Sequence, residues 1–158
     1  QEMGLRSGTE NVPNLVGFSV ASELAKKHLV SSRKQYQVLA KTFREIIEQK
    51  SKITPLWLGN PKHQLANFIP VCFDGLDAER LIFKLEDRGI YVSTGAACAA
   101  SKGQKSHVLS AIGLSDSEIA GSLRITLGKD TTLDDIKTAA DNLAEVVNLE
   151  ARRLKLID

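Results

Sequence analysis

The chain has 158 residues, 42% of them hydrophobic and 25% charged, and its formal net charge is +2. This composition is ordinary for a soluble globular domain that is large enough to bury a core of its own. The small charge argues against a nucleic-acid partner, and no apolar stretch approaches the roughly 20 residues that a membrane span needs.

The two cysteines and three histidines also exclude several classes of protein. A secreted disulfide scaffold of this length carries more cysteines, and a structural zinc site needs four Cys or His ligands in close pairs, whereas here they are scattered. We therefore expect a cytosolic protein with free thiols and no metal site.

Residues 1–12 are polar and contain two glycines, which is typical of a loop. Asn11 followed by Pro13 is a helix-start signal, because Asn caps free N–H groups and Pro suits the first turn. Apolar residues then recur at helical spacing to about residue 49, which predicts one long helix. Since the chain begins with Gln1 and its first residues have no core face, we expect a piece of a longer polypeptide.

Strands alternate with helices in the rest of the chain. This order predicts an α/β (α+β) fold in which helices cover a small sheet. Pro70 lies inside the first of these strands and suggests an edge position or a bulge. The expected elements are a strand at 66–73 after a turn-rich stretch at 54–63, a helix at 77–89, a strand at 90–93, a loop at 94–104, short helices at 106–112 and 115–120, a strand at 122–127 and a helix from 132 to about 154.

Cys98 is the residue best suited to chemistry. It lies in the sequence VSTGAACAASKG, where small neighbours leave the thiol unshielded, and nearby Lys102 and Lys105 favour the reactive thiolate. The alternative is a buried structural cysteine, because free cysteines are often buried. Cys72 is placed between Val71 and Phe73 in an apolar strand, and we predict that it is structural.

Arg124 is the second candidate. Alternation in the strand SLRITL puts Arg124 on the face of Ser122 and Thr126, opposite Leu123 and Ile125. An arginine on a polar face of a covered sheet suits two-point binding of a carboxylate. A structural salt bridge or an exposed edge position is the alternative.

A third candidate is the segment RSGTEN at residues 6–11. It offers two hydroxyls, an arginine and backbone N–H groups beside a glycine and a helix start, which together suit a phosphate. It matches neither a Walker loop nor a dinucleotide-binding motif, and a plain capping loop is the alternative. His107 suits a base, although a polar histidine at a helix end is the simpler interpretation.

Three separated motifs stand out along the chain. They are GLRSGTENVPNLVGF at 4–18, GIYVSTGAACAASKGQKSHVLSAIGL at 89–114 and SLRITLGKDTT at 122–132. Together they resemble the cysteine desulfurases, the NifS/IscS-like group of fold-type I pyridoxal-phosphate enzymes. The resemblance covers essentially the whole chain, and its one mild departure is Ala96 where the family usually has serine. The long segment from Cys98 to Ser106 is similar to the group with an extended catalytic loop.

The resemblance implies a role for each candidate. Cys98 would take the sulfur of L-cysteine as a persulfide and leave L-alanine, Arg124 would hold the substrate carboxylate, and Thr9 would bind the phosphate of pyridoxal 5'-phosphate in the partner subunit of a homodimer. An iron–sulfur scaffold or another sulfur-acceptor protein would receive the sulfur. The fold implied is the small C-terminal domain of an aminotransferase-like enzyme, with a mostly antiparallel sheet.

The resemblance also divides the chain and limits what it does alone. Residues 1–12 would be the tail of an upstream large domain, 13–50 a long connecting helix and 51–158 the small domain with the catalytic cysteine. The family's cofactor-binding lysine lies in a Ser-His-Lys setting that this sequence lacks. We therefore expect the chain alone to be inactive.

Two other functions stay open at this point. One is a selenocysteine lyase or a sulfinate desulfinase of the same superfamily, against which the long segment after Cys98 argues. The other is a free-standing persulfide carrier or scaffold-binding domain, which would gain support if the native gene began near Gln1.

Overall fold

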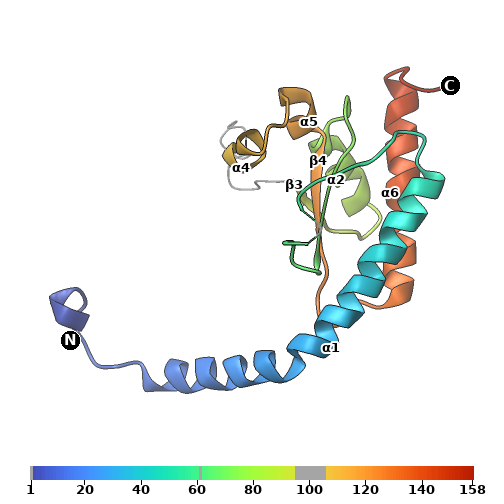
Figure 1. The fold of residues 1–158 in the computed structure, drawn as a ribbon. Helices are drawn as coiled ribbons and strands as arrows, with labels where there is room; N and C mark the ends of the chain where they lie inside the picture. The colour runs from blue at the N-terminus through green and yellow to red at the C-terminus, as the bar shows by residue number, and fades with distance from the viewer. Residues whose placement is uncertain (1, 61, 95–105) are drawn as a thin grey trace. The chain divides into compact units, whose positions relative to one another are not determined.

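The computed structural model describes residues 2–60, 62–94 and 106–158 and divides into two compact units, residues 1–34 and 35–158 (Figure 1). The helix α1, Val12–Lys50, contributes residues to both units. It agrees closely with the long helix that the sequence predicts. No helix in the described part of the chain is both long and apolar enough to cross a membrane.

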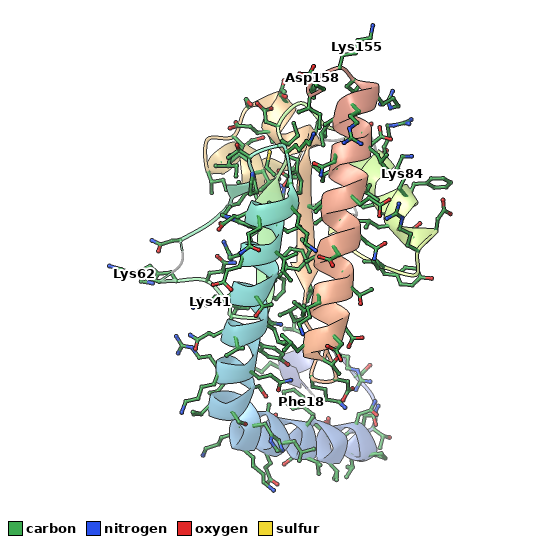
Figure 2. All side chains as sticks on the ribbon, turned by 90° about the vertical axis from the view of Figure 1, so that its right-hand side faces the viewer. Phe18, Lys41, Lys62, Lys84, Lys155 and Asp158 are labelled. Atoms are coloured by element: carbon green, nitrogen blue, oxygen red, sulfur yellow. The ribbon has the colours of Figure 1, made fainter. Side chains whose placement is uncertain are left out.

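Unit 1 holds a short 3-10 helix, η1 (Glu2–Gly4), an exposed segment and the first part of α1. The side chain of Asn11 accepts a hydrogen bond from the backbone N–H of Asn14 at 3.3 Å, so the expected cap is present. None of the side chains described in this unit is buried. Several large apolar residues of α1 are therefore exposed here, namely Val12, Leu15, Val16, Phe18, Val20, Leu24, Leu29 and Val30, of which Figure 2 labels Phe18.

Unit 2 is built around a four-stranded sheet with the order β1-β2-β4-β3. Every neighbouring pair is antiparallel, which agrees with the small, mostly antiparallel sheet expected from the resemblance. The two inner strands β2 and β4 form the longest ladder, from Phe68↔Thr126 to Cys72↔Ser122. The strands are β1 (Leu56–Trp57), β2 (Phe68–Cys72), β3 (Ser93–Thr94) and β4 (Ser122–Thr126).

The expectation for Pro70 is wrong, because β2 lies between β1 and β4 and its ladder with β4 runs without a bulge. The carbonyl of Pro70 accepts a hydrogen bond from the N–H of Leu58, so the backbone of Pro70 faces β1 and not β4. β1 ends at Trp57, just before this point. The missing N–H therefore removes no bond from the main ladder, which explains how proline fits an inner strand.

Helices cover one face of this sheet and form the main core. Leu123 and Ile125 of β4 pack with buried residues of α2, α6 and the part of α1 in unit 2. Figure 2 shows the side chains of α1 and α6 meeting along this layer. Side-chain caps start the helices of this unit, including the capping box of Thr132 with Asp135. The helices are α2 (Ala78–Glu86), α4 (His107–Ala111), α5 (Asp116–Ala120) and α6 (Leu133–Arg153).

Among the described residues, the opposite face of the sheet is covered mainly at one end. Cys72 packs there with Leu58 and Leu109 in a small second cluster beneath α4 and α5. Along β4 on this face, burial falls from Ser122, which is buried, to Thr126, which is exposed. The residues between these ends therefore border both protein and solvent.

A close backbone approach joins β2 to the start of β4. The N–H of Phe73 donates to the carbonyl of Gly121 at 3.0 Å, and a Cβ at Gly121 would overlap the carbonyl oxygen of Phe73. Because a backbone atom cannot move aside cheaply, we expect Gly121→Ala to lower the free energy of unfolding by about 2 kcal/mol. Urea unfolding of the chain measures this.

The matched control is Gly128→Ala, where the new Cβ would have only an ordinary contact with the Thr131 hydroxyl at 3.8 Å. We expect this variant to unfold close to the wild-type urea midpoint. Equal midpoints for Gly121→Ala and the wild type would contradict the close approach.

Candidate functional site

Arg124 occupies the middle of β4 on the partly open face of the sheet. Its cross-strand partners are Pro70 on β2 and Ser93 on β3. Leu123 and Ile125 on either side of it point into the core, so Arg124 faces the other way, with Ser122 and Thr126. The predicted alternation is therefore confirmed, and the arginine is half-buried.

Among the described residues, the guanidinium of Arg124 is held at one nitrogen. Nη2 donates a hydrogen bond to Oγ of Ser93 at 3.0 Å, and that hydroxyl donates in turn to the carbonyl of Thr94 at 2.9 Å. No carboxylate pairs with Arg124 among residues 2–60, 62–94 and 106–158. The structural salt bridge that was the alternative is absent from this part of the chain.

Nε of Arg124 is buried and has no hydrogen-bond partner among the described residues. A buried donor without a partner costs roughly 1–3 kcal/mol, so native structures rarely keep one without a reason. A carboxylate is the kind of group that accepts from two guanidinium nitrogens at once. Arg124 therefore keeps unused donor capacity among the described residues.

Thr9 lies in the exposed segment of unit 1 between η1 and α1. Gly8 beside it has φ of +133°, a conformation that side chains disfavour, so glycine is needed at this turn. The hydroxyls of Ser7 and Thr9 and the guanidinium of Arg6 are exposed and suit a phosphate. These residues have the donors that a phosphate group such as that of pyridoxal phosphate requires. None of the side chains described in unit 1 is buried, so they form no enclosed pocket for the rest of the cofactor.

Cys98, Lys102 and Lys105 lie outside the described residues, so the structure bears only on the other thiol. Cys72 is fully buried, as the sequence predicts. Burial raises the pKa of the Cys72 thiol to about 11, helped by the negative charges of Asp74 and Glu118 and opposed by the Ser122 hydroxyl. A thiol with this pKa is protonated at neutral pH and is a poor nucleophile.

His107 is the first residue of α4 and is exposed. Ser106 caps this helix by accepting from the N–H of Leu109 at 3.3 Å. Within the described ranges, no three His, Cys, Asp or Glu side chains gather in a way that would hold a metal ion.

The residue that sequence reasoning missed is Ser93. It lies beside Arg124 because the two strands pair, and no pattern in the neighbouring sequence indicates that pairing.

Comparison with known proteins identifies relatives along most of the chain. Residues 1–138 match the family model described as aminotransferase class-V. The chain is 40% identical over 148 residues to a protein named cysteine desulfurase IscS from Methanosarcina thermophila, covering 93% of this chain and 36% of the relative. It is 38% identical over 156 residues to cysteine desulfurase IscS 1 from Archaeoglobus fulgidus, covering 98% and 39%.

Solved structures that resemble this chain include proteins of the same type. A NifS-like protein aligns with a TM-score of 0.78 and 29% identity over 94% of this chain and 37% of its own. A NifS-like protein from Rickettsia africae aligns with a TM-score of 0.77 and 27% identity, covering 92% of this chain and 37% of its own. The chain thus spans little more than a third of the length of the proteins it matches. It belongs to the class-V aminotransferase family and, within that family, is homologous to the cysteine desulfurases of the IscS/NifS type.

Proposed function

We propose that the chain is part of a pyridoxal-phosphate-dependent cysteine desulfurase, which converts L-cysteine to L-alanine and a persulfide on Cys98. In this proposal Arg124 holds the substrate carboxylate and Thr9 contacts the cofactor phosphate. The observation that carries it is the half-buried Arg124 guanidinium, whose Nε lacks a partner among the described residues, in a chain homologous to these enzymes.

The proposed reaction transfers the substrate sulfur to the thiolate of Cys98. The thiolate of Cys98 attacks the sulfur of the substrate, a sulfur–sulfur bond forms and the carbon–sulfur bond breaks. The electron pair of the broken bond stays on carbon, which takes a proton and becomes the methyl group of L-alanine. Pyridoxal phosphate, when bound, would supply the electron withdrawal that activates the substrate carbon.

The roles of the two units differ in this proposal. Arg124 fixes the substrate at its carboxylate, which leaves the sulfur end free to meet Cys98. Residues 6–11 of unit 1 would serve the active site of a partner subunit in a homodimer. The exposed apolar side chains of α1 in unit 1 suit burial against the remainder of a longer polypeptide. An iron–sulfur scaffold or another acceptor protein would collect the sulfur.

Substitution of Arg124 in the intact enzyme tests the proposal. Arg124→Ala should raise the Michaelis constant for L-cysteine by about 30- to 900-fold, which corresponds to about 2–4 kcal/mol for the loss of a buried charged contact. Arg124→Lys should recover only part of the binding, because an ammonium cannot make the planar two-point fork. Steady-state rates of L-alanine formation across cysteine concentrations give both parameters.

The matched control is Arg88→Ala on the helical side of the sheet, where Arg88 pairs with the exposed Glu145. This variant should leave the Michaelis constant unchanged. If Arg124→Ala also leaves it unchanged, the carboxylate is held elsewhere. An intact enzyme that acts on selenocysteine or cysteine sulfinate but not on cysteine would place the chain in another branch of its superfamily.

A further inference from the structure

The hydroxyl of Ser93 has both of its hydrogen-bonding functions committed. Its hydrogen goes to the carbonyl of Thr94 at 2.9 Å, and its oxygen accepts from Nη2 of Arg124 at 3.0 Å. A guanidinium has only donors, so the Ser93 oxygen must accept from Arg124. The single hydrogen of the hydroxyl is then left for the carbonyl of Thr94.

The backbone places Ser93 directly beside the guanidinium of Arg124. Ser93 and Arg124 are cross-strand partners in the β3–β4 pair, so their side chains rise from the same face of the sheet. Serine is short and keeps its oxygen close to the strand, whereas arginine has a long flexible stem that can adopt many rotamers. A short side chain on one strand thus fixes the end of a long side chain on the next.

We propose that Ser93 is a positioning residue for Arg124. Its hydroxyl oxygen holds Nη2, limits the rotamers of the arginine and leaves other N–H groups of the guanidinium to receive a carboxylate. The inference rests on the proposed role of Arg124 and adds the residue that prepares it. Preparing a binding group before the ligand arrives strengthens binding without adding a contact to the ligand.

This role predicts a specific kinetic pattern in the intact enzyme. Ser93→Ala should raise the Michaelis constant for L-cysteine about 3- to 10-fold, the scale of one hydrogen bond, and leave kcat nearly unchanged. Ser93→Thr keeps a hydroxyl on a residue type that strands favour, so it should restore the Michaelis constant to within about twofold of the wild type.

A double substitution separates positioning from a general structural effect. If Ser93 acts through the guanidinium, Ser93→Ala should cost little in an Arg124→Lys background, because the fork it holds is already gone. Thr126→Ala removes a hydroxyl from the same face two residues along β4 and is the matched control. It should leave the Michaelis constant unchanged.

A second measurement reports substrate binding without any catalytic turnover. In a Cys98→Ala background, equilibrium titration with L-cysteine gives a dissociation constant, and Ser93→Ala should weaken it by the same factor of about 3 to 10. If Arg124→Ala weakens binding and Ser93→Ala does not, the positioning role of Ser93 is overturned while the proposed function stands. If neither substitution weakens binding, the proposed carboxylate site itself is wrong.

Discussion

Replacing Cys98 with alanine in the intact enzyme is expected to abolish sulfur release from L-cysteine while L-cysteine still binds. The proposed reaction needs a thiolate to take the substrate sulfur, and an alanine side chain offers no nucleophile. The substrate carboxylate would still be held by Arg124, so the substrate dissociation constant should change little. Assays of sulfide and L-alanine after reduction, together with an equilibrium titration, measure the two effects separately.

Cys72 provides the matched control, because it is the only other thiol in the chain. Burial raises its pKa to about 11, so at pH 8 only about one Cys72 side chain in a thousand is a thiolate. Cys72→Ala should keep its turnover and lose on the order of 1 kcal/mol of stability from the small core of Leu58 and Leu109. An inactive Cys72→Ala beside an active Cys98→Ala would show that the wrong thiol was chosen.

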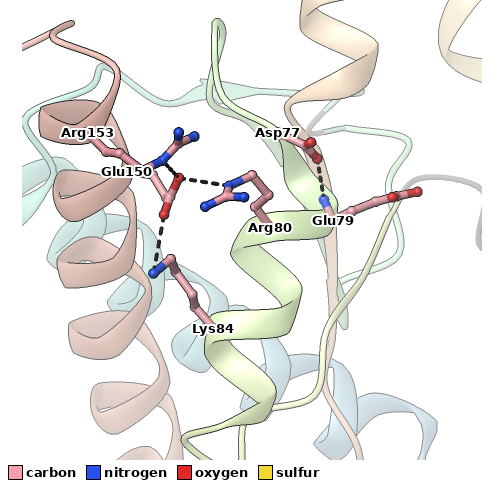
Figure 3. A network of polar contacts seen from close by, with 6 residues as sticks. All are labelled: Asp77, Glu79, Arg80, Lys84, Glu150 and Arg153. Carbon is pink, nitrogen blue, oxygen red and sulfur yellow. Dashed lines mark hydrogen bonds and ion pairs between the residues drawn. The ribbon is translucent and has the colours of Figure 1, made fainter.

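Replacing Glu150 with glutamine is expected to lower the free energy of unfolding by about 1–2 kcal/mol at neutral pH. Glu150 is 3% exposed on α6 and stands among three cations (Figure 3). Its Oε2 lies 2.7 Å from Nε of Arg153 and 3.1 Å from Nε of Arg80, and its Oε1 lies 3.3 Å from Nζ of Lys84. Glutamine keeps the shape but leaves these cations without their shared anion.

The same network predicts the acid response of the fold. Burial alone would raise the pKa of Glu150, but the hydrogen bonds from Arg153, Arg80 and Lys84 outweigh it and hold the pKa at about 2. A carboxyl with a lowered folded pKa stabilises the fold above its unfolded pKa, and this contribution is lost as the pH falls toward 2. The full shift would correspond to about 3 kcal/mol, and the partly exposed cations reduce it to about 1–2 kcal/mol.

Urea unfolding between pH 7 and pH 3 checks both expectations. Wild type should lose stability below about pH 5, and Glu150→Gln should lose less over the same range. Glu145→Gln is the matched control on the same helix, because Glu145 pairs with Arg88 but is 61% exposed, and it should unfold much like the wild type. Equal effects of the two substitutions would contradict the role given to the buried network.

Most of the secondary structure follows from local sequence. Asn11, Asp77, Ser106 and Thr132 cap helices where their side chains suggest, because capping depends on neighbours three residues away or closer. The alternation of SLRITL correctly placed Arg124 on the face opposite Leu123. The burial of Cys72 also followed from its apolar strand, since strand periodicity and burial are linked.

The sequence was a poorer guide where pairing decides the structure. The sequence predicts a turn-rich stretch where β1 lies, because two residues carry no periodic signal and only pairing with β2 makes them a strand. The short strand expected at 90–93 is instead Ser93–Thr94, since its position is set by its partner on β4. The sequence predicts an edge or a bulge at Pro70, whereas an inner strand can hold a proline when its missing N–H faces away from the main ladder, as it does here.

In the candidate site, too, some features follow from local sequence and others only from strand pairing. The residue types alone nominated Cys98, Arg124 and the segment RSGTEN, because a thiol among small residues, an arginine in a strand and hydroxyls beside a glycine each suggest a chemistry locally. The resemblance to the cysteine desulfurases then singled out Thr9 within that segment. The tertiary structure alone joined Ser93 to Arg124, 31 residues apart, and left Nε of the arginine buried without a described partner. Local patterns reveal which groups are present, whereas strand register decides which of them meet across a sheet.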